Sequence, residues 1–164
     1  MFIIDIVSNT PIYVWFLFAY LLIIGLKATK TRTIWVPQLF TIPIILTFIR
    51  FHKLWLLGPI YTLIPWIIGI HFGVTAGVTN KTMEFIIEKN SVRLKGSYAT
   101  LIILLTLFSI KYIINVMHDL YPLWYEQYGF LDTVVTFLFA GYSFGKAIIY
   151  TSRFLKHKYK KSRL

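Results

Sequence analysis

The sequence predicts an all-α integral membrane protein: a bundle of five transmembrane helices, with a short cytoplasmic β-hairpin between helices three and four. Of the 164 residues, 57% are hydrophobic and only 14% are charged, whereas about a quarter of a soluble domain is charged. The apolar residues fall into five blocks with short charged or aromatic connections between them. Each block comes near the roughly 20 residues that a helix needs to cross a bilayer, which leaves no room for a soluble domain.

Prolines mark the beginnings of several helices. Pro11 follows Asn9 and Thr10 and suits the first position of a helix, where a backbone N–H would have no partner. Pro37 and Pro43 fall in the second block, so that helix is expected to start late or to kink. The expected helices cover residues 11–26, 34–51, 57–79, 97–117 and 130–150 of a transmembrane domain at 1–152, and a basic cytoplasmic tail follows at 153–164.

The connection between the third and fourth blocks has a pattern of its own. Residues 83–96, MEFIIEKNSVRLKG, alternate briefly between apolar and polar on both sides of Lys89 and Asn90. Such alternation around a turn predicts a β-hairpin, and Gly96 would then lead the chain into helix four. A surface amphipathic stretch is the alternative interpretation.

The basic residues orient the bundle, because lysine and arginine are enriched in cytoplasmic loops. With the N-terminus outside, thirteen of the 17 lysines and arginines lie on the cytoplasmic side, and only Arg50 and Lys53 lie outside. We therefore expect a multi-pass protein of the cell inner membrane with its C-terminus in the cytoplasm. This arrangement explains the net charge of +11 without nucleic acid, and it predicts that the tail is attracted to anionic membrane lipid.

Polar residues recur at helical spacing along helices four and five. Such a stripe in a membrane faces the bundle interior or a water-filled cleft rather than lipid. His71 adds a polar side chain near the middle of helix three. The residues that we expect in an intramembrane polar cleft or ligand site are Lys111, Asn115, His118, Asp132, Ser143, Lys146 and His71.

Lys111 is the least expected of these residues, because no adjacent acid accompanies it in its apolar run. Its side chain leans toward the N-terminal end of helix four and so toward the membrane centre. An unpaired charge there would cost about 2.5–3.5 kcal/mol. We expect a partner, either Asp132, Asp5 or a helical carbonyl; a neutral Lys111 is the alternative.

Small residues predict close helix packing. Helix three carries glycines four residues apart, and helix five carries a pair on the side away from Lys146. Such faces let two helices approach closely. Since the two helices run parallel, their glycine faces could meet within one chain. A face left over would suit a second protomer, so we also expect a homodimer. The glycines expected in helix packing are Gly69, Gly73, Gly77, Gly141 and Gly145.

No residue pattern predicts catalysis. The chain has no cysteine and contains no HExxH, GxSxG or P-loop motif. His71 is interpreted as a hydrogen-bonded core histidine, with a haem or quinone ligand as the alternative. A metal site is not predicted, because the polar residues of the outer ends lack ligand spacing on one helix face. These outer residues are His52, His118, Asp119 and Asp132.

Two stretches resemble a family of small bacterial inner-membrane proteins of unknown function. They are TPIYVWFLFAYLLIIGLKATKTR at 10–32 and VRLKGSYATLIILLTLFSIKYIINV at 92–116. The likeness lies in a Thr-Pro start, a basic end to helix one and a Gly-Ser-aromatic entry into a helix with Lys-Tyr. Thr100 stands where that pattern has a proline, and a more distant resemblance is to CcdC-like proteins linked to cytochrome maturation. The resemblance marks Gly96, Ser97, Lys111 and Tyr112 and implies no activity.

Together these observations favour a non-enzymatic integral membrane protein. It would bind a lipid, another small amphipathic ligand or a membrane partner in its polar cleft. Two alternatives stay open: a small transporter or flippase for an anionic substrate, and a haem- or quinone-linked redox subunit. The sequence does not identify a cofactor.

Overall fold

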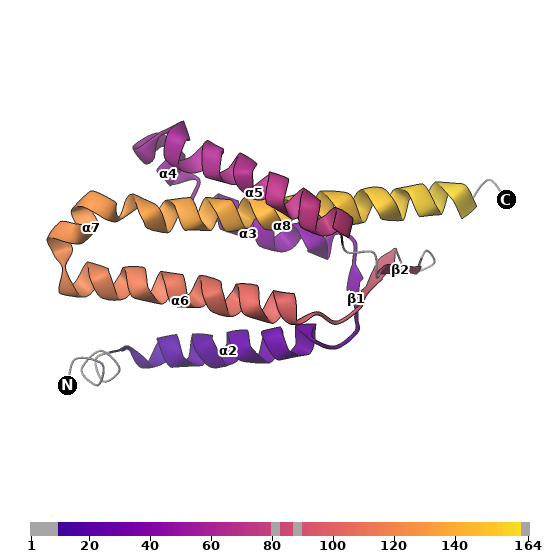
Figure 1. Cartoon of the computed structure of the whole chain (residues 1–164), viewed down its shortest axis with the longest axis horizontal. Coiled ribbons are helices and arrows are strands. Elements are labelled where there is room, and N and C mark those ends of the chain that lie inside the picture. Colours follow the sequence, from indigo (N-terminus) through magenta and orange to yellow (C-terminus); the bar gives the residue numbers. More distant parts are fainter. Residues whose placement is uncertain (1–9, 80–82, 87–89, 162–164) are drawn as a thin grey trace. The chain divides into compact units, whose positions relative to one another are not determined.

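The computed structural model describes residues 10–79, 83–86 and 90–161. The chain divides into two compact units, each assembled from two separate stretches of sequence (Figure 1). The first unit holds the chain up to Thr31 together with Gly96–Gly129. The second unit holds Arg32–Lys95 and Phe130–Leu164.

The first unit is an antiparallel helix pair. Helix α2 (Ile12–Ala28) packs along α6 (Tyr98–Leu120), and α7 (Pro122–Tyr128) follows α6. At one end, the hydroxyls of Thr10 and Tyr112 are hydrogen-bonded at 2.6 Å. Further along, the rings of Phe18 and Phe108 lie 5.1 Å apart. A polar contact and an aromatic contact therefore fix the register of the pair.

The entry into α6 depends on Gly96 and Ser97. A Cβ atom at Gly96 would overlap the backbone carbonyl of Thr29, so only glycine allows this approach. Ser97 is the N-cap of α6: its side chain accepts a hydrogen bond from the Ala99 N–H at 3.2 Å. Its own N–H donates to the Ala28 carbonyl at 3.1 Å, which joins the beginning of α6 to the end of α2.

The second unit is built around α8 (Phe130–Lys161). Helices α5 (Pro59–Thr79) and α3 (Gln38–Ile49) both pack on α8, and the short α4 (His52–Leu57) packs on α5. Rings from three helices meet here: Phe144 lies 5.7 Å from Phe40 and 5.5 Å from Trp66. These aromatic contacts hold α3 and α5 against the middle of α8.

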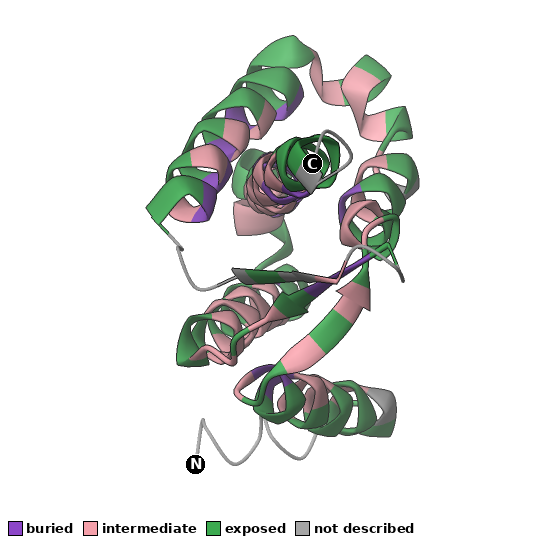
Figure 2. Ribbon diagram, turned by 90° about the vertical axis from the view of Figure 1, so that its right-hand side faces the viewer, coloured by how far each residue is buried: buried purple, intermediate pink, exposed green. Residues whose placement is uncertain are grey.

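Small residues bring α5 and α8 into backbone contact. The buried residues of α5 are Thr62, Pro65, Gly69, Gly73 and Gly77, which form one stripe along the helix (Figure 2). A Cβ atom at Gly73 would overlap the carbonyl of Tyr142, and one at Gly141 would overlap the carbonyl of Trp66. The two glycine faces therefore cover each other within the chain. A homodimer, which stays a prediction, would need another surface.

A three-stranded antiparallel sheet completes the second unit. Its strands are β1 (Arg32–Trp35), β2 (Met83–Ile86) and β3 (Ser91–Leu94), in the order β1-β3-β2. The pair β2–β3 forms the two arms of the expected hairpin, whose Lys89 lies outside the described residues. Asn90, at the end of the turn, has a left-handed φ of 46°, a conformation that asparagine adopts more readily than most residues. Strand β1 was not expected.

The five expected transmembrane helices are not all present at membrane length. In the described part of the chain, three helices are long and apolar enough to cross a membrane: Pro59–Thr79, Tyr98–Leu120 and the Phe130–Lys160 part of α8. The first expected helix is the 17-residue α2. The second, expected at 34–51, is wrong in its first part: residues up to Trp35 form β1, and α3 begins only after Pro37.

The reason for this difference is local. Thr33, Ile34 and Val36 are β-branched, which favours a strand, and the residue before a proline avoids the helical conformation. The 12 residues of α3 then extend about 18 Å, well short of the roughly 30 Å hydrocarbon core.

The segment of the expected basic tail that the structure describes is helical, because α8 continues without a break to Lys161, and its cytoplasmic position stays a prediction. Arg153 donates to the Val78 carbonyl at 2.8 Å, and Lys158 donates to the Asn90 side chain at 3.3 Å. The first contact satisfies a carbonyl at the end of α5, and a cation there also suits the helix dipole. Up to Lys161, the basic segment is thus a helix that contacts the end of α5 and the turn before β3.

Candidate functional site

The side chain of Lys146 is the most unusual polar group of α8. It is half-buried on a helix of membrane length. Its Nζ atom lies 5.4 Å from the ring centre of Tyr142 and 5.8 Å from that of Tyr150. Since these tyrosines stand one turn before and one turn after Lys146, its ammonium lies between their two aromatic rings. Both contacts are in the range of cation–π attraction.

A second cation accompanies Lys146. The guanidinium of Arg32, at the start of β1, is close enough that its positive charge repels that of Lys146. Burial lowers the pKa of Arg32, but an arginine remains charged at neutral pH. Among the residues that the structure describes, no carboxylate lies within ion-pair distance of either cation. Lys146 and Arg32, with Tyr142 and Tyr150, are called the cationic site below.

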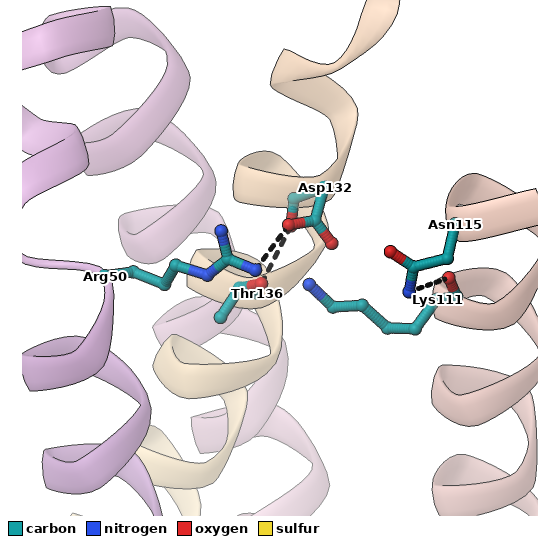
Figure 3. A network of polar contacts seen from close by, with 5 residues as sticks. All are labelled: Arg50, Lys111, Asn115, Asp132 and Thr136. Atoms are coloured by element: carbon teal, nitrogen blue, oxygen red, sulfur yellow. Dashed lines mark hydrogen bonds and ion pairs between the residues drawn. The ribbon is translucent and has the colours of Figure 1, made fainter. Parts of the chain in front are cut away.

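The other end of the α8 span has a different polar arrangement, shown in Figure 3. Asp132, in the first turn of α8, pairs with Arg50 from the end of α3 at 2.6 Å. The Thr136 hydroxyl donates to the Asp132 carbonyl at 2.7 Å. Because Asp132 also stands at a helix N-terminus, it is held by both a cation and the helix dipole. Arg50 was expected only as a charge outside the membrane, so its pairing with Asp132 was not predicted.

In the first unit, Lys111, Asn115 and His118 lie on α6. The side-chain amide of Asn115 donates to the Lys111 carbonyl at 3.0 Å, as the right side of Figure 3 shows. His118 is exposed and contacts the neighbouring Asp119, with Nδ1 2.9 Å from the carboxylate. Of the acids expected to pair with Lys111, Asp5 lies outside the described residues and Asp132 pairs with Arg50. An acidic partner for Lys111 stays a prediction.

His71 and Ser143 complete the predicted site residues. His71 is exposed on α5, with its ring 6.2 Å from that of Phe72. The interpretation as a core histidine is therefore wrong, because the side chain points away from the glycine stripe that packs on α8. Ser143 is half-buried on α8, less than one turn before Lys146. The single cleft expected to hold all seven residues stays a prediction, because the structure places three of them in the first unit and four in the second.

The described part of the chain contains no group of three or more His, Asp or Glu residues arranged to hold a metal ion. Comparison with protein-family models, with curated proteins and with solved structures gives no match for this chain. Any function must therefore be argued from the geometry of the two units.

One signal in the sequence could have identified the cationic site. Tyr142, Lys146 and Tyr150 are spaced by four residues, which places their side chains on one face of a helix. Arg32 could not be found in this way, because its position near Lys146 depends on strand β1, which was not expected.

Proposed function

We propose that the protein is a non-enzymatic integral membrane protein that binds a small amphipathic ligand at the polar face of α8. The observation that carries this proposal is the half-buried Lys146, whose ammonium is accompanied by two tyrosine rings and by a second cation. Three apolar helices of membrane length support a position of this site in or beside a bilayer.

Charge repulsion at the site supports a ligand over a purely structural role. A lysine in a membrane span costs about 2.5–3.5 kcal/mol near the bilayer centre and less toward the interface. A cation–π contact returns about 0.5–2 kcal/mol, but the nearby Arg32 works against this gain. An anionic group between Lys146 and Arg32 would stabilise both charges. The hydrocarbon part of such a ligand would lie against apolar surface of the kind that Leu138 exposes on the same helix.

Retention of a ligand is the first expected result. Purified full-length protein in a mild detergent should carry bound molecules of lipid-like mass in native mass spectrometry. Lys146→Met should lose most of them, because the positive charge that holds the ligand is removed. Lys156→Met is the matched control, since Lys156 is an exposed lysine of the same helix. Absence of bound molecules, or equal retention by Lys146→Met, would contradict the proposal.

We also propose an orientation in the inner membrane with the N-terminus outside and the basic end of α8 in the cytoplasm. The support is the distribution of charge, since thirteen of 17 lysines and arginines then lie inside. A reporter fused after Leu164 should be active only if it is a type that works in the cytoplasm. Cleavage of the fused end by protease added from outside would show the opposite orientation.

A further inference from the structure

We propose that the ligand of the cationic site is an anionic phospholipid, whose phosphate binds between Lys146 and Arg32. This inference rests on the proposed ligand-binding function and names the chemistry that the site selects. Three properties of the cationic site support this assignment: the depth of Lys146 along α8, the two cations and the two tyrosines.

The first property is depth. Lys146 follows Phe130, the first residue of α8, by a length of helix of about 24 Å at about 1.5 Å per residue. The hydrocarbon core of a bilayer is about 30 Å thick. If α8 enters the core near Phe130, Lys146 lies close to the opposite boundary, where phospholipid phosphates begin. The sheet that carries Arg32 lies at the same end of the second unit, because β2 follows the end of α5.

The second property is the charge of the site. Lys146 and Arg32 put two positive charges in the second unit, and an anion close to both would be stabilised by both. An arginine guanidinium can donate two parallel hydrogen bonds to phosphate oxygens, and a lysine ammonium adds a point charge. Basic sites among transmembrane helices on the cytoplasmic side are suited to anionic head groups. On the proposed orientation, Arg32 and the basic end of α8 lie on that side.

The third property is the pair of tyrosines. Tyrosine rings are favoured at the boundary between hydrocarbon and head groups, because the ring is apolar and its hydroxyl is polar. Tyr142 and Tyr150 hold the Lys146 ammonium from both directions along the helix. This arrangement limits the positions of a flexible lysine before the ligand arrives, which reduces the entropy lost on binding.

The experiment uses full-length protein that has been stripped of lipid in detergent. Phosphatidylglycerol, phosphatidylcholine and inorganic phosphate are added separately, and binding is followed by native mass spectrometry and by thermal unfolding. Phosphatidylglycerol should bind and raise the melting temperature, phosphatidylcholine should bind at least tenfold more weakly, and inorganic phosphate should have little effect. Lys146→Gln and Arg32→Gln should each reduce phosphatidylglycerol binding about tenfold, which corresponds to about 1.4 kcal/mol.

Two controls separate loss of charge from loss of folding. Lys156→Gln removes an exposed charge from the same helix and should bind as the original protein does. Lys146→Arg keeps the charge and should retain binding. Failure of Lys146→Arg to bind, with its folding intact, would count against a site that recognises charge.

The outcomes also separate the assignment of an anionic phospholipid from the proposed ligand-binding function. Equal, Lys146-dependent binding of phosphatidylcholine and phosphatidylglycerol would overturn the anionic assignment and leave the ligand-binding function in place. Inorganic phosphate that binds as tightly as phosphatidylglycerol would assign the site to free phosphate instead of lipid. No binding of any lipid would overturn both proposals.

Discussion

Replacing Arg50 by methionine is expected to lower the free energy of unfolding by about 3 kcal/mol, because it removes the Arg50 cation from a buried carboxylate. Asp132 is the group left behind, and its side chain keeps only 11% of its surface exposed. Breaking a buried ion pair typically costs about 3–5 kcal/mol. The expected loss is at the low end of this range, because the Arg50 side chain itself is 30% exposed. Unfolding in mixed detergent, followed by fluorescence of the five tryptophans, measures the change.

A second substitution separates the ion pair from the packing around it. When both partners are replaced, as in Arg50→Met with Asp132→Leu, the carboxylate that has lost its Arg50 cation is removed as well, so much of the lost stability should return. Lys53→Met removes a positive charge from α4, three residues after Arg50, and should change stability by less than about 0.5 kcal/mol. If the double variant is less stable than Arg50→Met alone, the carboxylate is not the cause of the loss.

Gly73→Ala is expected to destabilise the second unit by about 3 kcal/mol or more, although it adds a single methyl group. The new Cβ atom would overlap the Tyr142 carbonyl oxygen, and a helix backbone cannot move aside as a side chain can. Gly141→Ala should have a similar effect, because its Cβ would overlap the Trp66 carbonyl. The same unfolding measurement in detergent reports both.

Gly77→Ala provides the matched control on the same stripe. There the nearest atom to an added Cβ is Cβ of the Ile149 side chain, at 3.0 Å, so a small adjustment suffices. Its cost should be near 1 kcal/mol, in the range of mild overpacking. Equal stability of Gly73→Ala and Gly77→Ala would show that the α5–α8 backbone contact does not limit stability.

Patterns within one element could be predicted from the sequence. The apolar blocks at 57–79, 97–117 and 130–150 correspond to α5, α6 and α8, because hydropathy and length are local properties. The alternation around Asn90 indicated the pair β2–β3 for the same reason. Glycines at every fourth position indicated a close helix contact, and these residues do line the contact of α5 with α8.

Contacts between distant elements could not be predicted. Asp132 was assigned to a cleft, but its partner Arg50 stands at the end of a different helix, and no local pattern connects them. Arg32 belongs to the cationic site only because β1 pairs with β3, and these two strands are far apart in the sequence. The extension of α8 was missed for another reason: its charge was used to predict topology, although lysine and arginine are also good helix formers.

The strand order β1-β3-β2 has a consequence for synthesis of the chain in the cell. Strand β1 is complete once Trp35 has been made, but its neighbour β3 begins only at Ser91. At about 5–20 residues per second, the ribosome needs several seconds to supply that partner. Both α3 and α5 leave the ribosome during this interval, while the hydrogen-bonding edge of β1 is still open. The sheet therefore forms late in synthesis, and its formation joins the segment before α3 to the segment after α5.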